Sequence, residues 1–242
     1  MRDPWTIQIL KEGNVIKFVF RIITHSKYLM SSLIGEIFSE EERELTQKYQ
    51  VIMRLIGSGV WNTRDLANDL YNNKVFDTPD VNHLGPYLKN LQEMELLETI
   101  KIYKTKNKHY YRLKSPIMNV YHYLDSRYDI SNRNCSLNEI EPTLQKLINF
   151  EIQNFVADFF AEKYDGRKEY YLSSSKEVDF IITKRNKPII VGEVKWKTIT
   201  KEDIERFKES VKDFYCRKVL ICKKGIKDNQ IETIDAEGLL RL

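Results

Sequence analysis

Apolar residues recur at helical spacing in three groups between about residues 45 and 95. These are Leu45, Tyr49, Ile52, Leu55 and Ile56; Leu66, Ala67 and Leu70; and Leu84, Leu88 and Leu91. Gly57 and Gly59 favour the end of the first helix, and Asn62 or Thr63 is placed to cap the second. Pro86 is expected in the first turn of the third helix, where its missing N–H has no intrahelical acceptor. The pattern predicts three consecutive short helices.

Two short strands are predicted next, over residues 98–103 and 109–113, joined by the basic turn KTKNK. Three helices followed by a basic hairpin is the order of a winged helix-turn-helix, which we assign to residues 45–115. Basic side chains neutralise phosphates, and a recognition helix reaches base edges. The predicted DNA contacts are His83, Tyr87, Lys89, Asn90, Lys104, Lys106, Lys108 and Arg112. A hairpin whose charges only face solvent is the alternative for this segment.

The segments on either side of this region predict further helices. Residues 1–44 are apolar on more than one face, which indicates a docked helical segment. Residues 116–135 begin with Pro116 and predict a connecting helix that ends in a polar stretch over residues 131–134. That stretch is the predicted linker to the last domain, residues 136–242.

The last domain is predicted to be α/β. A long helix over about residues 139–163 precedes two strands over residues 177–184 and 188–196. A helix from Lys201, with Thr200 able to cap it, and the strand RKVLIC follow. The whole chain is therefore expected to be of the α+β or α/β class.

The two adjacent strands carry the strongest chemical signal. Asp179 and Glu193 are equidistant from Asn186, the centre of the predicted turn Arg185–Lys187, so they should stand opposite each other on one face. Lys195 shares that face, because strand side chains alternate. A register slip of one residue would put the two carboxylates on opposite faces.

Two adjacent carboxylates repel each other unless a cation neutralises them. Mg²⁺ or Mn²⁺ takes oxygen ligands, and a lysine beside them can orient a water or neutralise charge on a phosphate. These residues therefore indicate phosphodiester hydrolysis. Lys197 continues the alternation, either as a phosphate contact or as a solvated lysine.

Asp179 followed by Glu193-x-Lys195 resembles the PD-(D/E)XK nuclease superfamily, which has a restriction-endonuclease-like fold. Val178 stands where the family has proline. The resemblance implies that Asp179 and Glu193 bind the metal and that Lys195 is catalytic. It also implies an additional ligand on the preceding helix, and Glu151 in NFEIQNF fits that role. Phe150, Ile152, Phe155, Val156 and Phe159 would pack that helix on the sheet.

A second resemblance covers most of the chain. The winged helix, YYRLKSPIMNVYHYLDSRY and EVDFII…VGEVKWK look like the C-terminal half of an archaeal P-loop ATPase family. The chain has no GxxxxGK[ST] motif, so no ATP binding through a P-loop is expected. The resemblance implies a nuclease-like, DNA-binding relative without the ATPase domain.

Composition adds little to this picture. The net charge of +4 does not by itself indicate nucleic acid. Three cysteines without a CxxC pair suggest reduced thiols and a cytoplasmic protein, and no membrane span or signal peptide is apparent. Double-stranded DNA and a divalent metal are the expected partners, with a homodimer or a protein partner possible. A non-catalytic DNA-binding regulator and a protein-interaction module are the alternatives.

Overall fold

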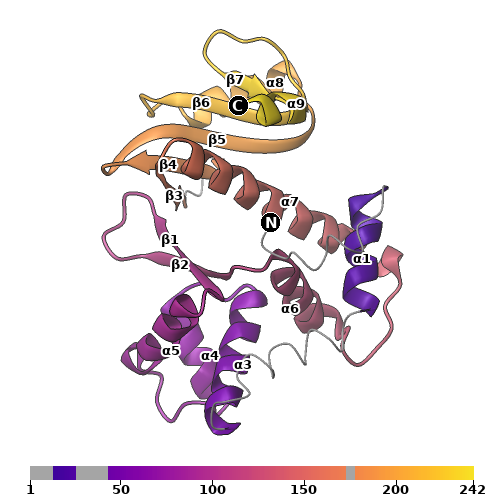
Figure 1. Ribbon diagram of the computed structural model, residues 1–242, viewed down its shortest axis with the longest axis vertical. Helices are drawn as coiled ribbons and strands as arrows, with labels where there is room; N and C mark the ends of the chain where they lie inside the picture. The colour runs from indigo at the N-terminus through magenta and orange to yellow at the C-terminus, as the bar shows by residue number, and fades with distance from the viewer. Residues whose placement is uncertain (1–12, 26–42, 173–177) are drawn as a thin grey trace. The chain divides into compact units, whose positions relative to one another are not determined.

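The computed structural model describes residues 13–25, 43–172 and 178–242. Within those ranges it contains eight helices and a seven-stranded mixed sheet, which confirms the mixed α and β class (Figure 1). The chain divides into two compact units, Met1–Thr99 with His109–Ile148 and Ile100–Lys108 with Asn149–Leu242. The division therefore falls inside the long helix α7 (Leu137–Lys163). The predicted linker at residues 131–134 lies within the first unit.

Besides the first part of α7, five helices and two strands of the described residues lie wholly or partly in the first unit. The helices are α1 (Val15–His25), α3 (Arg43–Gly57), α4 (Thr63–Asn72), α5 (Val81–Glu93) and α6 (Pro116–Tyr128), and the strands are β1 (Leu97–Ile102) and β2 (His109–Leu113). The order of α3, α4, α5, β1 and β2 is the predicted one. Only α1 represents the expected helical N-terminal segment, because residues 1–12 and 26–42 lie outside the described residues.

Local hydrogen bonds explain where these helices begin. Asn62 caps α4 by accepting from the Asp65 N–H at 2.9 Å, and Ser115 caps α6, with Pro116 in its first turn. Pro86 was expected in the first turn of α5 but is its sixth residue, because α5 begins at Val81. The helix therefore lacks the hydrogen bond that a residue-86 N–H would donate to the Asn82 carbonyl.

The first unit has its own apolar core. Its buried residues come from α3, α4, the segment between α4 and α5, α5 and the hairpin strands: Tyr49, Ile52, Met53, Ile56, Leu66, Leu70, Phe76, Leu84, Leu88, Leu91, Leu97 and Leu113. Every apolar position that the sequence pattern assigned to the second and third helices is buried. Burial of this shared face stabilises three helices that are too short to be stable alone.

The second unit is built on the sheet. Its elements are the part of α7 (Leu137–Lys163) from Asn149 onward, β3 (Arg167–Tyr170), β4 (Phe180–Lys184), β5 (Lys187–Thr198), α8 (Lys201–Ser210), β6 (Arg217–Lys224), β7 (Glu232–Ile234) and α9 (Ala236–Arg241). The strand order is β2-β1-β3-β4-β5-β6-β7. The pairs β3–β4 and β4–β5 are antiparallel, whereas β1–β3, β5–β6 and β6–β7 are parallel.

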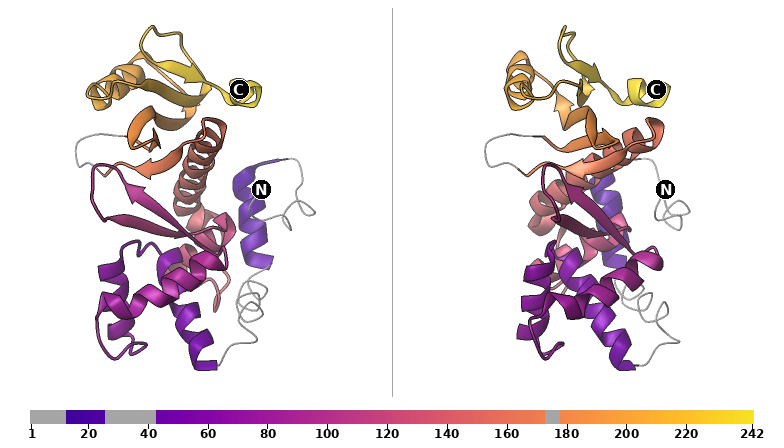
Figure 2. Two further views of the ribbon diagram at one scale, coloured as in Figure 1. Left: turned by 60° about the vertical axis from the view of Figure 1, so that its left-hand side comes forward. Right: turned by 90° about the vertical axis from the view of Figure 1, so that its left-hand side faces the viewer.

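Two apolar layers cover the faces of this sheet. On one face Val156, Ala157 and Phe160 of α7 pack against buried residues of β4, β5 and β6. On the other face Ile204 and Phe207 of α8 pack against the alternate residues of the same strands. Figure 2 shows α7 and α8 on these two sides. Phe155, which was expected to pack α7 on the sheet, is instead 64% exposed, because α7 turns its Val156 side to the strands.

The three cysteines are free thiols, as the sequence predicts; Cys135 and Cys222 are buried and Cys216 is half-buried. Burial raises the pKa of the Cys222 thiol to about 11, which keeps it protonated and unreactive at neutral pH. No helix in the described ranges is both long enough and apolar enough to cross a membrane.

Candidate active site

The hairpin of β4 and β5 sets the register of the predicted site. Its turn is the two residues Arg185 and Asn186, both with positive φ (52° and 61°), rather than the three expected. Such a turn alone would align Asp179 with Gly192. A β-bulge corrects this alignment, because Thr183 pairs with Pro188 while Ile182 pairs with Ile190.

Asp179 immediately precedes Phe180, the first residue of β4, and contacts two backbone groups of β5. Its N–H donates to the Gly192 carbonyl at 3.0 Å, and its carboxylate Oδ2 accepts from the Val194 N–H at 2.7 Å. Gly192 and Val194 flank Glu193 in the strand. The structure therefore brings Asp179 alongside Glu193, as the hairpin pattern predicts.

Glu193 and Lys195 form an ion pair on one face of β5. Glu193 is 5% exposed and Lys195 is half-buried. Val191 lies on the same face of β5 as this pair and packs in the apolar layer that contains α8. Val194 lies on the opposite face and packs in the apolar layer that contains α7. A carboxylate this deeply buried requires a partner, and Lys195 supplies the positive charge.

Lys197 continues the same face into a second ion pair. Its Nζ lies 3.1 Å from Asp203 Oδ1, and Asp203 is buried at the start of α8. Asp203 also accepts hydrogen bonds from the backbone and hydroxyl of Thr200 in a capping box. The Thr200 backbone N–H, together with Lys197, lowers the pKa of Asp203 to about 2. Sequence reasoning identified Thr200 as a cap but missed Asp203, although the spacing Thr-x-x-Asp signals it.

Glu151 is half-buried on α7, which packs against the face opposite Glu193 and Lys195. Across residues 13–25, 43–172 and 178–242, no three His, Cys, Asp or Glu side chains form a group that could hold a metal ion. Glu177 and Lys176 lie outside these ranges. The structure thus brings Asp179, Glu193 and Lys195 together, and gives no three-carboxylate cluster with Glu151.

A buried carboxylate that the sequence did not single out lies on the neighbouring strand β3. Glu169 is 4% exposed. It pairs with Ile181 of β4, whose side chain packs in the apolar layer that contains α8. Its Oε1 accepts from the Thr183 hydroxyl at 2.9 Å and lies 3.9 Å from Lys101 Nζ. Its Oε2 has no hydrogen-bond partner in the part of the chain that the structure describes. The segment RKEY has no apolar run, so neither β3 nor its buried glutamate was predicted.

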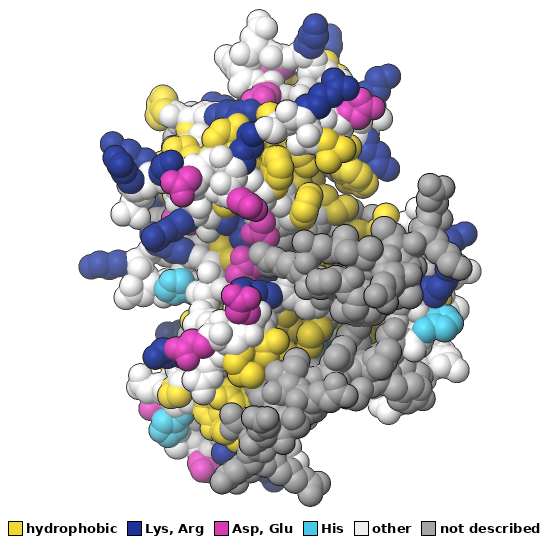
Figure 3. Space-filling view, in the orientation of Figure 1, with side chains coloured by type: hydrophobic (Ala, Val, Ile, Leu, Met, Phe, Trp, Pro, Cys, Tyr) yellow, Lys and Arg dark blue, Asp and Glu magenta, His cyan; other side chains and the backbone are white. Residues whose placement is uncertain are grey.

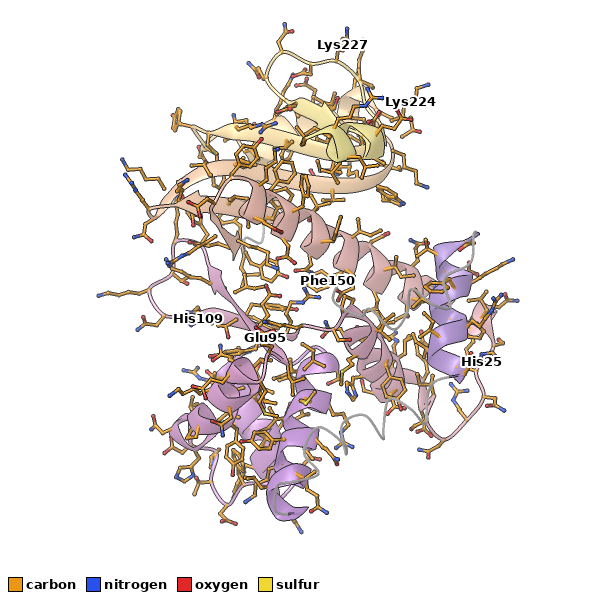
Figure 4. All side chains as sticks on the ribbon, in the orientation of Figure 1. His25, Glu95, His109, Phe150, Lys224 and Lys227 are labelled. Carbon is orange, nitrogen blue, oxygen red and sulfur yellow. The ribbon has the colours of Figure 1, made fainter. Side chains whose placement is uncertain are left out.

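The turn between β1 and β2 exposes three of the predicted DNA contacts, Lys104, Lys106 and Lys108. Dark-blue Lys and Arg side chains project from the side of the molecule on which this turn lies (Figure 3). Arg112 departs from the prediction, since it is 3% exposed and lies 3.6 Å from Glu98. It lies three residues beyond His109, which begins β2 and is labelled in Figure 4. Arg112 is therefore a structural ion-pair residue.

The predicted contacts on α5 divide by exposure. His83, Lys89 and Asn90 are exposed, although Lys89 lies 3.5 Å from Glu93 and Asn90 donates to the Tyr49 hydroxyl at 2.7 Å. Tyr87 is half-buried, with its ring 5.4 Å from Tyr49 and 5.3 Å from Phe76. Its ring belongs to the core, so only part of Tyr87 is available to a ligand.

No protein-family model matches the chain, and comparison with curated proteins and with solved structures gives no match either.

Proposed function

We propose that the second unit is a Mg²⁺- or Mn²⁺-dependent deoxyribonuclease of the PD-(D/E)XK type. The observation that carries the proposal is the arrangement of Asp179 beside Glu193, with Lys195 in contact with Glu193. The predicted site requires the β4–β5 register that places Asp179 next to Glu193. The two carboxylates come from adjacent strands that buried apolar layers hold on both faces, which favours a fixed geometry.

The donor set fits a hard divalent cation. Asp179 and Glu193 would hold the metal through carboxylate oxygens. The metal supplies charge neutralisation at a phosphate and lowers the pKa of a bound water. The Lys195 ammonium would orient the attacking water and neutralise charge on the phosphate.

The basic turn supports duplex DNA as the substrate. Lys104, Lys106 and Lys108 lie on a tight turn with no acidic residue, where they contact phosphates through charge alone. Residues 45–115 would form the winged helix, with exposed His83, Lys89 and Asn90 of α5 reaching the groove. Lys197 would remain paired with Asp203 or exchange that partner for a phosphate.

One observation favours a second candidate, a non-catalytic DNA-binding regulator. In the Glu193–Lys195 ion pair the lysine itself balances the charge of the buried carboxylate, so the pair is neutral without a metal. In such a protein the nuclease-like scaffold would serve stability or contact with a partner chain.

Metal titration followed by cleavage assays separates the two. Mg²⁺ or Mn²⁺ should raise the melting temperature of the wild-type protein, and Glu193→Gln should abolish the shift. Linear, branched and single-stranded DNA should be tested with wild type, Lys195→Gln and the surface control Lys212→Gln. Cleavage that requires the metal and Lys195, but not Lys212, supports the nuclease. DNA binding with neither a metal shift nor cleavage supports the regulator.

A further inference from the structure

A cavity of about 250 Å³ lies in the first unit, and its lining includes no residue of the candidate active site. It is lined by Gln50, Val51 and Arg54 of α3, by Tyr121, His122 and Asp125 of α6, and by Ser131. A single buried water needs only about 10–15 Å³. The cavity is therefore large enough for a small organic molecule.

His122 is the unusual side chain in this wall. It is 5% exposed, and neither Nδ1 nor Nε2 has a hydrogen-bond partner among the described residues. Its ring backs onto Gly57, where an added Cβ would come within 2.6 Å of the His122 Cβ. A neutral imidazole carries one donor and one acceptor, and leaving both unpaired in a protein interior is costly. A molecule in the cavity would satisfy them.

The charges around the cavity define what that molecule should be. Arg54 is exposed and Asp125 is half-buried, so one cation and one anion face the same space. No ion pair within 4.0 Å joins these two side chains in the described part of the chain. Asp125 Oδ1 accepts from the Ser131 N–H at 2.8 Å, which fixes the carboxylate in the wall. Val51 gives the cavity an apolar surface beside these groups.

We propose that this cavity is a binding site for a free α-amino acid. The ligand carboxylate pairs with Arg54, its ammonium pairs with Asp125, and His122 and Gln50 hydrogen-bond its polar groups. A zwitterion matches the separated cation and anion, whereas a simple anion or cation leaves one of them unpaired. The site is independent of the proposed nuclease function.

The test is calorimetric titration of the full chain with each of the twenty common L-amino acids. At least one should bind with a dissociation constant of about 1 mM or tighter. For that ligand, the analogues lacking the ammonium or the carboxylate should bind about ten-fold more weakly or worse. This comparison needs no variant, so it holds even if a substitution disturbs folding.

Variants then locate the site. Arg54→Gln and Asp125→Asn should each weaken binding about ten-fold. Asn retains the oxygen that accepts from the Ser131 N–H. Arg127→Gln on α6, an exposed charge outside the cavity, should leave the affinity unchanged. Binding should also move the ring ¹⁵N signals of His122. The proposal fails if no amino acid binds at about 10 mM, if both analogues bind as tightly as the parent, or if Arg127→Gln has the same effect as Arg54→Gln.

Discussion

The Asp179 carboxylate accepts a hydrogen bond from the Val194 backbone N–H of β5 at 2.7 Å, one residue before β4 begins. The side chain thus has a structural task besides any role in metal binding. Asp179→Ala leaves the Val194 N–H without this acceptor and should cost about 1–3 kcal/mol in the free energy of unfolding. Asp179→Asn retains an acceptor and should cost less. Urea denaturation measures both, and an equal loss in the two variants would contradict the structural role.

Gly192 is required by its close approach to Phe180. A Cβ at this position would lie 2.2 Å from Phe180 Cζ, and Phe180 is a fully buried ring whose centroid is 5.8 Å from Phe160. Gly192→Ala should therefore lower the free energy of unfolding by about 1–3 kcal/mol through overpacking. Gly85→Ala on α5 is the control, because nothing lies within 4 Å of its added Cβ. Calorimetric melting of both variants measures the difference, and equal melting temperatures would refute the argument.

The sequence predicted the alignment of the two strands that carry the candidate site, because the register of one hairpin depends on a short local pattern. Alternation placed Glu193 and Lys195 on one face without knowledge of the rest of the sheet. The bulge opposite Ile182 could not be foreseen, and the assumed three-residue turn led to the same alignment as a two-residue turn with a bulge. The predicted register of the two strands is therefore the observed one, but a bulge produces it rather than a three-residue turn.

Other features escaped prediction because they depend on contacts distant in sequence. Arg112 looked like part of a basic surface until its pairing with Glu98 across the hairpin was visible. Phe155 looked like a core residue because helical spacing does not say which side of α7 meets the strands. His122 sits in an ordinary amphipathic helix, and only the fold reveals that both ring nitrogens are buried. In each case contacts between distant parts of the chain determine the burial of a side chain that the local sequence pattern leaves open.

Burial of His122 should make the stability of the protein depend on pH. Desolvation lowers the pKa of its imidazole to about 4, against an opposing effect of Asp125 and a further lowering by Arg54. The unfolded chain binds the His122 proton more tightly than the folded protein does. The free energy of unfolding is therefore unaffected by this group above pH ~6.5, and it falls by up to about 3 kcal/mol as pH falls toward 4. Denaturation of wild type and His122→Gln at pH 7 and 5 measures this. The exposed-residue variant His83→Gln should keep the wild-type slope, and a wild-type slope in His122→Gln would contradict the assignment.

Salt dependence should report on the basic turn. If Lys104, Lys106 and Lys108 each contact a phosphate, each Lys→Ala substitution should reduce the slope of log affinity against log salt by about 1. Arg112→Lys should leave that slope unchanged, because the guanidinium is buried against Glu98. Fluorescence anisotropy with a labelled duplex at several salt concentrations measures the slopes. An unchanged slope in the triple lysine variant would remove the turn from the DNA-binding surface.

The measurement that tests the active-site proposal most directly is the single-turnover cleavage rate of duplex DNA by wild type and Asp179→Asn in Mg²⁺ or Mn²⁺. The asparagine variant should fold and bind DNA like the wild type, because it keeps an acceptor for the Val194 N–H. Loss of the carboxylate charge should slow cleavage by about 100-fold or more. Equal cleavage by the two proteins, or cleavage by the wild type that chelation of the metal does not stop, would contradict a metal-dependent site at Asp179, Glu193 and Lys195.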